Sequence, residues 1–509
     1  MNANLAVRLM NALVPARFFA GTAGRFLLLL PLLAAGCATS PDSQMARVPV
    51  ETPDRFEATG RTDSFPATAW LTDFTDPQVR DVVREALARN FDLQAAAARV
   101  EAAVANQRIA AASRLPQLGA TAGASRRGTA TELANGDISH DTLDTLSLGL
   151  NLAWEIDLWG KLKNRTQAAI ADYEAETNVL HAARLSLAAT TLKAWFNAVE
   201  LELQLALARE TLDIFEKNLT VVEGSYKRGL PNRALDVRLT RANVEAARST
   251  VEARRRQRDA AGRSLEVLLG RYPGDAIVLV TNLPPLLHEV PPGLPADLLH
   301  RRPDILAAER RLAASLERVK VARKDLLPTV SLSASGGTAS SELRDLLDSD
   351  RVFWNVAGNL AQPLFQGGRL RAGVDLANAN SRQAVATFSQ TVLNAFREVE
   401  TFLAAEDFLR REEAALENAA VESIGGEQLA WQQYQRGLVD IITVLESQRR
   451  AFNARSSLLN VINDRLQNRI NLHLALGGDF TAPPPVEDTE TGSTLPAPAA
   501  SRPLAALAP

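Results

Sequence analysis

The chain has 509 residues, and its 56 basic and 59 acidic side chains leave a formal net charge of -3 at pH 7. A balance so close to neutrality argues against nucleic acid as a partner. The single cysteine leaves no pair for a disulfide bond and no set of thiolates for a metal ion. The length predicts more than one domain.

The N-terminus has the pattern of a secretory signal. Arg8, Arg17 and Arg25 make it basic, and an apolar run of about ten residues over 26–35 is too short to span a bilayer. Small residues then lead directly to the cysteine. We therefore predict a signal peptide over residues 1–36. An ordinary signal peptide followed by an incidental cysteine is the simpler alternative.

The residues around Cys37 resemble a bacterial lipobox, with Ala34 at the position where Leu is usual. The resemblance implies that cleavage makes Cys37 the first mature residue and that lipid is attached to its thiol. Ala38, which follows it, favours sorting to the outer membrane. Several acyl chains, at about 0.8 kcal/mol per buried methylene, would hold the N-terminus on a membrane. We expect residues 37–69 to form an extended, lipid-bearing arm.

The rest of the chain repeats itself. Residues 90–124 align without gaps on residues 302–336, and "YKRGL" at 226–230 matches "YQRGL" at 434–438. A period of about 210 residues is too long for a solenoid, so we interpret it as a duplicated domain. The predicted division is a first repeat at 70–270, a linker at 271–295, a second repeat at 296–478 and a disordered, proline-rich tail at 479–509.

Each repeat contains segments of period two. Between residues 145 and 158, Leu, Trp and Ile alternate with polar or small residues, which predicts a strand with one apolar and one polar face. The segment 353–365 is its counterpart in the second repeat. Weaker strands are expected at 116–125 and 328–337, paired with these as hairpins. The linkers at 126–144 and 338–352 are polar and predict surface loops.

Each repeat continues with long helices. The segment 163–229 contains no proline and is dominated by Ala, Leu and Glu, which predicts a helix of roughly 60 residues and about 90 Å. A return helix is expected at 234–269, ending at Gly270, with its counterpart at 441–476. Helices of this length need partner helices along them. A dimeric coiled coil is the alternative, although no sustained Leu heptad supports it.

Strands and helices together predict an assembly of several chains. A soluble, half-buried sheet would explain the alternation alone, but an exported chain with strands of about ten residues favours a transmembrane barrel. Four strands cannot close a barrel in lipid, because open edges leave backbone groups without hydrogen bonds. Three chains would supply twelve strands and twelve helices.

The repeat, the two "Y-x-R-G-L" turns and the stretch "PPGLPADLLHRRPDILAAERRL" at 291–312 resemble the outer-membrane efflux channels of the TolC family, in particular its lipoprotein branch of OprM-like and NodT-like proteins. The resemblance covers residues 70–478. It implies an α+β membrane protein in the outer membrane of a Gram-negative bacterium: a trimer with a 12-stranded barrel, a 12-helix periplasmic tunnel about 100 Å long and a mixed α/β belt.

The resemblance also implies a function and partners. The channel would conduct drugs or other small molecules passively, and it would work with a periplasmic adaptor and an inner-membrane pump, most often of the resistance-nodulation-division class. A duct for polypeptide secretion and a lipid-anchored periplasmic coiled-coil adaptor are the alternatives. Apart from the lipid on Cys37, no cofactor is expected.

Two tyrosines and two glycines lie where each long helix meets its return helix. Tyr226 and Gly229 belong to the first repeat, and Tyr434 and Gly437 to the second. We expect both turns at the periplasmic tip. In the family the second-repeat tip narrows to a gate, and Tyr434 matches its constraining tyrosine.

The resemblance places further gate candidates on the last helix. Glu446 falls on an acidic-ring position, and three such carboxylates around an axis would attract cations and raise one another's pKa. A solvated helix-face residue is the alternative. Thr443 and Val439 occupy positions often filled by Asp and Arg, so Asp440 is a candidate to replace part of the usual network.

Enzyme chemistry is not predicted. The sequence shows no nucleophile elbow, no phosphate loop and no paired carboxylates with a supporting histidine. The histidines are scattered without metal-ligand spacing, at His140, His181, His288, His300 and His473.

Overall fold

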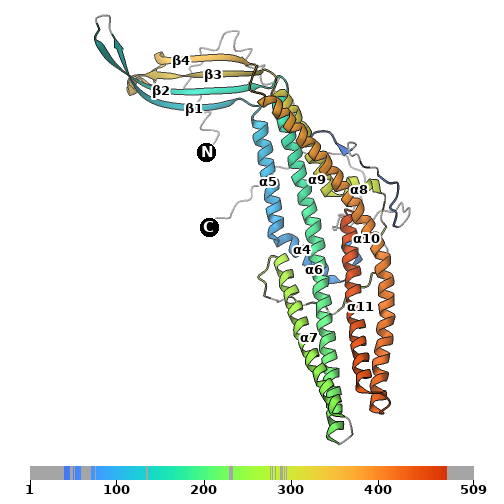
Figure 1. Cartoon of the computed structure of the whole chain (residues 1–509). Helices are drawn as coiled ribbons and strands as arrows, with labels where there is room; N and C mark the ends of the chain where they lie inside the picture. The colour runs from blue at the N-terminus through green and yellow to red at the C-terminus, as the bar shows by residue number, and fades with distance from the viewer. Residues whose placement is uncertain are drawn as a thin grey trace, which may run out of the picture.

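The computed structural model describes residues 39–45, 50, 52–58, 70–74, 76–132, 136–228, 233–274, 277, 279–280, 282–286, 290–291, 293 and 295–478. The predictions for the signal peptide, Cys37, Gly229 and the tail lie outside these residues. The molecule is elongated, with a sheet at one end and long helices that extend from it (Figure 1).

The two longest helices correspond to each other in the two repeats. Helices α6 (Lys161–Lys227) and α10 (Arg369–Gln435) have 67 residues each, or about 100 Å. Each begins after a glycine in the left-handed region, Gly160 at φ 72° and Gly368 at φ 83°, where a side chain would be strained. The predicted long helices are confirmed.

The return helices are also confirmed. They are α7 (Arg233–Leu268) and α11 (Ile441–Ala475), and glycines with positive φ, Gly270 and Gly477, follow them. Shorter helices complete the two repeats: α4 (Pro77–Arg89), α5 (Phe91–Ala112), α8 (Pro295–Arg301) and α9 (Pro303–Lys324). No described helix combines the length and the apolar character needed to cross a membrane.

The four strands form one antiparallel sheet in the order β1-β2-β3-β4. Their bounds are Gln117–Glu132, Ile138–Ile156, Thr329–Ser340 and Val352–Ala361. Both predicted hairpins are confirmed, and pairing of β2 with β3 joins the two repeats.

The prediction of a polar loop over 126–144 is wrong for most of that segment. Strands β1 and β2 stay paired out to Glu132 opposite Ile138. The ladder joins backbone groups, so it continues where the side chains no longer alternate in polarity. Strand β4 ends earlier than predicted, two residues before Pro363, which cannot donate a ladder hydrogen bond.

The register gives the sheet two different faces. Leu150 lies opposite Ala120 and Gly336, whereas its neighbour Asn151 lies opposite Gly119 and Ser335 on the other face. Other large side chains on the face of Leu150 are exposed, among them Trp354 at 78% and Val356 at 61%. One chain therefore leaves an apolar sheet face uncovered.

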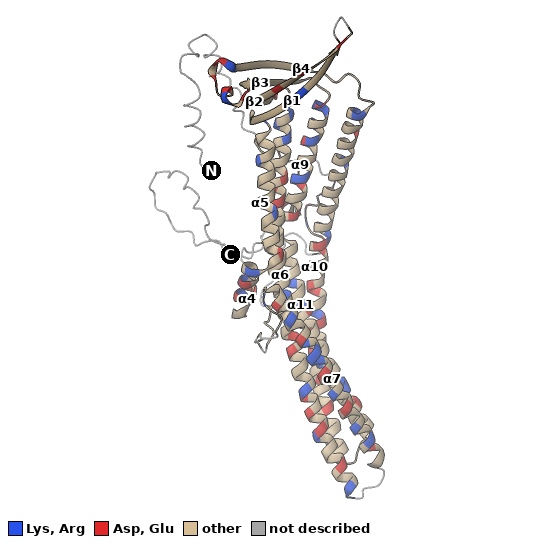
Figure 2. Ribbon diagram, turned by 90° about the vertical axis from the view of Figure 1, so that its left-hand side faces the viewer, with Lys and Arg blue, Asp and Glu red and all other residues tan. Residues whose placement is uncertain are grey.

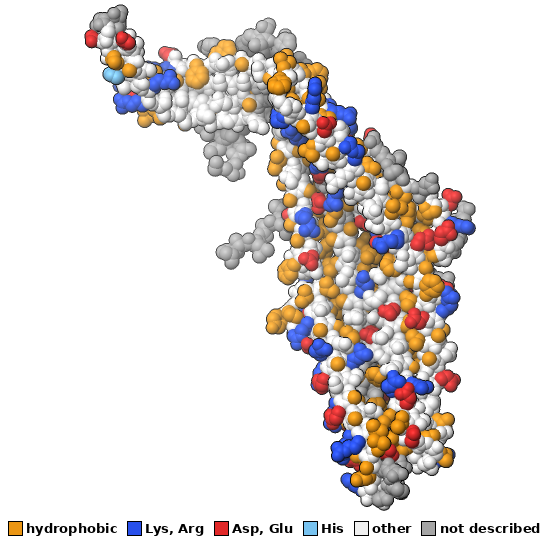
Figure 3. Space-filling view, viewed as in Figure 1, with side chains coloured by type: hydrophobic (Ala, Val, Ile, Leu, Met, Phe, Trp, Pro, Cys, Tyr) orange, Lys and Arg blue, Asp and Glu red, His pale blue; other side chains and the backbone are white. Residues whose placement is uncertain are grey.

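Charged side chains are unevenly distributed. Figure 2 shows them along the whole length of the helices and only sparsely on the strands. In the space-filling view the middle of the sheet carries almost no charge, and charged side chains gather toward the β1–β2 hairpin end (Figure 3). Arg126 and Asp144, which face each other in the register, form one pair there at 3.4 Å.

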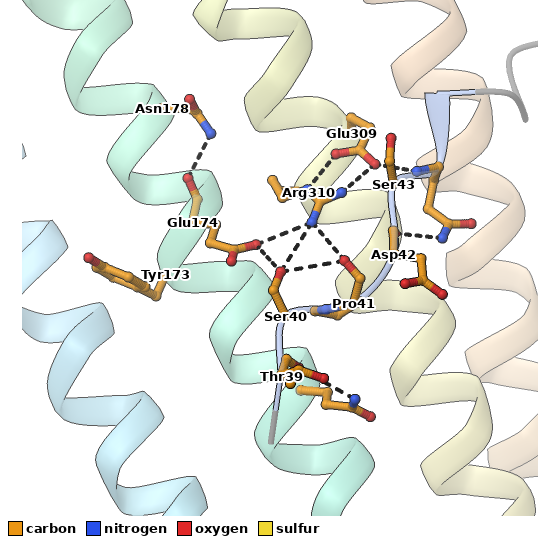
Figure 4. A network of polar contacts seen from close by, with 12 residues as sticks. Thr39, Ser40, Pro41, Asp42, Ser43, Tyr173, Glu174, Asn178, Glu309 and Arg310 are labelled. Atoms are coloured by element: carbon orange, nitrogen blue, oxygen red, sulfur yellow. Dashed lines mark hydrogen bonds and ion pairs between the residues drawn. The ribbon is translucent and has the colours of Figure 1, made fainter. Parts of the chain in front are cut away.

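The described part of the N-terminal arm is docked on the helices (Figure 4). Arg310 of α9 donates to the Pro41 carbonyl oxygen at 3.0 Å, and Ser40 donates to the Glu174 carboxylate of α6 at 2.9 Å. Glu309 holds the Arg310 guanidinium, with a 2.7 Å bond from Nη2. Farther along the arm, Phe56 is buried among side chains of α8, α10 and α11.

Candidate functional site

The ends of the long helices remote from the sheet come together in one apolar cluster. Val222 of α6, Val237 of α7, Tyr434 of α10 and Val444 of α11 are all buried in it. Each of the four helices therefore contributes to the tip, and the hairpins of the two repeats pack directly on each other there.

Tyr434 ties the two hairpins together. Its hydroxyl donates to the Asp236 carboxylate at 2.9 Å, from α10 to the first turn of α7. The tyrosine is only 4% exposed, and its ring stacks on Trp431 with centroids 5.7 Å apart. The bond is partly buried and has a carboxylate as its acceptor, and charge-assisted hydrogen bonds are among the stronger links between helices.

Sequence reasoning missed Asp236. A signal was present in the repeat: at the offset of 208 residues that matches Tyr226 with Tyr434, Asp236 falls on Val444, so this acid breaks the symmetry. A polar residue present in only one of the two repeats is a candidate for a contact between the repeats.

The two repeat tyrosines have different environments. Tyr226 is 51% exposed, whereas Tyr434 is buried. Gly437 follows the second helix at φ 74°, and its backbone N–H donates to the Tyr434 carbonyl at 2.9 Å. The predicted helix-tip turn thus exists in the second repeat.

Asp440 and Thr443 bond to each other. The Thr443 backbone N–H and hydroxyl donate to the same Asp440 carboxylate oxygen at 2.9 and 2.8 Å, which caps the start of α11. These two bonds lower the pKa of Asp440 below its usual value. A role of either residue in a constraint between chains stays a prediction.

Glu446 is paired within its own helix. Arg449 donates to its two oxygens at 2.7 and 3.1 Å, and Arg450 donates at 3.2 Å. These hydrogen bonds lower the pKa of Glu446 within the single chain. Its place in an acidic ring stays a prediction.

Glu446 and Arg449 also line a groove of about 510 Å³ between α6, α7 and α11. Apolar side chains from all three helices form much of its wall, including Phe215, Leu239 and Ile442. The groove lies close to the tip, because Leu239 is three residues from Asp236.

Above the tip, α6 and α11 are fastened by a buried polar network. The Gln204 amide donates to the Ser456 carbonyl at 3.0 Å and accepts from the Ser456 hydroxyl at 2.8 Å. Arg455 forms two bonds with Glu210, at 3.0 and 2.7 Å, which lower the pKa of that carboxyl. The Tyr434–Asp236 bond is thus one of several links between the repeats.

No group of three or more potential metal ligands occurs among the described residues. Of the histidines, His473 is buried, lies 2.9 Å from the Asp73 carboxylate and stacks on Trp70. These contacts pack the end of α11 on the segment before α4.

A family model described as "Outer membrane efflux protein" matches residues 82–271 and 294–478. The chain is 34% identical to the outer membrane protein OprJ of Pseudomonas aeruginosa over 89% of this chain and 95% of that protein. It is 32% identical to the cation efflux system protein CusC of Escherichia coli, over 89% of this chain and 98% of CusC.

Two further similarities concern lipid and structure. The probable outer membrane lipoprotein SilC of Salmonella typhimurium is 31% identical over 88% of this chain and 97% of SilC. A crystal structure of a membrane protein from Pseudomonas aeruginosa superposes with a TM-score of 0.79 at 33% identity, covering 87% of this chain and 98% of that one.

Proposed function

Because the chain belongs to the outer membrane efflux protein family, we propose that three copies assemble into one channel that conducts small molecules passively. The chain is an efflux channel of the outer membrane. The observation that carries the proposal is the two-faced sheet, whose apolar face stays exposed in one chain while helices of 67 residues extend from it.

The proposed number of chains follows from the number of strands that a closed barrel needs. Two copies of the four-stranded sheet would give eight strands, and side chains fill the interior of a barrel of that size. Three copies would give twelve strands and a wider interior. The inward face would carry small and polar residues such as Gly119, Asn151 and Ser335, which leave room for a hydrated passage.

The helices would extend the passage into the periplasm. We infer that a periplasmic adaptor and an inner-membrane pump, of the resistance-nodulation-division class, engage the end of the molecule that carries the tip cluster. CusC is named for cation efflux, and a toluene efflux pump protein, TtgF, is as similar at 32% identity. Overall sequence identity therefore does not indicate which small molecules this channel conducts.

We also propose that lipid is attached to Cys37, and one set of measurements tests both the channel and the lipid. Detergent-extracted protein is expected to give a trimeric native mass and defined conductance steps in planar bilayers, and its N-terminal peptide should carry the added mass of acyl chains. Cys37→Ser should lose that mass and keep the steps. A soluble, non-conducting protein released by Cys37→Ser would contradict the channel and favour the adaptor alternative.

Glu446 is proposed to favour cations at the tip. Glu446→Ala is expected to lower the cation-over-anion permeability ratio of single channels. Because Arg449 and Arg450 lower its pKa, the carboxylate stays ionised as the pH falls below the usual range of Glu, so the preference of the unmodified channel should persist there. Glu245→Ala, on the exposed surface of α7, is the control. Unchanged selectivity in Glu446→Ala would remove this residue from the conducting path.

A further inference from the structure

The four connections between helices and strands all expose large apolar side chains. Leu158 and Trp159 lie between β2 and α6, and Leu364 and Phe365, between β4 and α10, are 92% and 90% exposed. The other two connections add Leu115, Leu326 and Leu327. We call these seven residues the apolar collar. An exposed apolar surface is typical of contact with a membrane or another protein, and Trp is enriched at membrane surfaces.

A basic pocket lies next to the collar, between α9 and α10. Its volume is about 380 Å³, and Lys320, Arg323 and Arg382 line it. Among the described residues of the lining, Glu317 is the one acid. Arg323 precedes Leu326 of the collar by three residues, so the pocket begins where the collar ends. Figure 2 shows basic side chains at the ends of the helices that adjoin the sheet.

Glu317 does not cancel the positive charge of the pocket. Its carboxylate is buried and accepts a hydrogen bond from Lys320 at 2.5 Å. Arg323 and Arg382 are exposed, and neither forms an ion pair with a residue that the structure describes. Asp375, seven residues before Arg382, is the nearest acid along α10, about 10 Å away along the helix axis. Two guanidinium groups are therefore available to an anion.

The N-terminal arm passes the same pocket. Gln44 of the arm is part of the lining. Nearer the collar, Gln167, six residues after the start of α6, donates to the Thr39 carbonyl oxygen at 3.4 Å. Cys37, which is proposed to carry lipid, is two residues before Thr39, or at most about 7 Å away. Acyl chains on Cys37 would therefore enter a membrane close to the collar.

We propose that Lys320, Arg323 and Arg382 bind the phosphate of an anionic phospholipid in the periplasmic leaflet of the outer membrane. The headgroup lies in the pocket, and the acyl chains lie against the apolar collar. Arginine suits this ligand because its planar guanidinium can donate two parallel hydrogen bonds to a phosphate.

A net negative charge on the lipid is the expected basis of selection. Each Lys or Arg near the surface of an anionic membrane favours binding by about fivefold. In a zwitterionic lipid the headgroup's own cation offsets the phosphate. The inference goes beyond conduction, and it rests on the proposed barrel, which places the sheet in the membrane.

Lipid retention tests the site. The full-length protein is reconstituted in vesicles that contain equal parts of phosphatidylglycerol and phosphatidylcholine with identical acyl chains, extracted, and weighed by native mass spectrometry. Phosphatidylglycerol should be retained in preference. Arg323→Gln combined with Arg382→Gln should lower this preference by about fivefold for each arginine. This variant keeps Lys320, so the buried Glu317 carboxylate retains its partner.

Arg238→Gln combined with Arg256→Gln is the matched control. Both arginines are exposed on α7, far from the sheet, and form no ion pair with described residues. This variant should keep the preference. Equal retention of both lipids by the unmodified protein, or an equal loss in the two double variants, would overturn the site. Displacement of the phosphatidylglycerol by inorganic phosphate at constant ionic strength would show that the pocket binds a free anion, and would overturn the lipid as its ligand.

Conductance separates this inference from the proposed channel. Arg323→Gln with Arg382→Gln should keep the defined conductance steps in planar bilayers. Unselective lipid retention by a protein that conducts would overturn the lipid site alone. A protein that neither conducts nor retains phospholipid would contradict the channel as well.

Discussion

Replacing Tyr434 with Phe is expected to raise the single-channel conductance severalfold. The substitution removes the hydroxyl that donates to Asp236 and keeps the ring stacked on Trp431, so the apolar cluster at the tip is preserved. What is lost is the polar link at the tip, one of several between the hairpins of the two repeats. The tip should therefore spend more time in a wider state.

The expected size of the conductance change follows from the free energy of this hydrogen bond. A hydrogen bond to a charged group contributes about 1.5–3 kcal/mol, so its loss shifts the balance between tied and untied hairpins by a factor of roughly 10 to 150 per chain. Asp236→Asn keeps an acceptor oxygen without the charge and should give an intermediate increase. Recordings in planar bilayers measure both.

Tyr226→Phe is the matched control, because this tyrosine stands at the same repeat position and is half exposed. It should leave conductance unchanged. Equal conductance in Tyr434→Phe and the unmodified channel, at equal trimer content, would show that the Tyr434–Asp236 bond does not restrain the tip.

Leu150→Arg is expected to abolish assembly in the outer membrane. Leu150 lies on the apolar face of the sheet and is 55% exposed in one chain. Arginine on the lipid face of a barrel costs about 2–4 kcal/mol near the bilayer midplane, and a trimer would carry three copies. Quantifying the heat-resistant trimer in outer-membrane fractions measures the effect.

Asn151→Arg is the control on the opposite face of the same strand. It should assemble normally and shift ion selectivity toward anions, because the added charges would line the passage. Normal assembly of Leu150→Arg with failure of Asn151→Arg would mean that the faces of the sheet are assigned the wrong way round.

The sequence by itself determined the elements whose pattern is local. Alternation around Leu150 predicted a strand and its apolar face, and uninterrupted helix formers predicted α6 and α10. The repeat predicted that both halves contain the same parts. These signals survive because side-chain direction follows from backbone geometry over neighbouring residues.

Local patterns failed where pairing or packing outweighed them. Strands β1 and β2 extend through a polar segment, because the hydrogen-bond ladder holds backbone groups whatever the side chains are. Helices α5 and α9 were aligned as repeat segments without being assigned a conformation. The docking of the arm on Arg310 was not foreseen, since its partners lie more than a hundred residues away.

At the tip, tertiary structure decided which candidates act together. Tyr434 was found from its turn, but its partner Asp236 is 198 residues away in the chain. Thr443 and Asp440 proved to bond each other, and Glu446 bonds arginines on its own helix. Two tyrosines in matching turns differ in burial because only one faces the neighbouring hairpin. The two sequence repeats specify similar backbones. The packing of one repeat against the other gives equivalent side chains different surroundings.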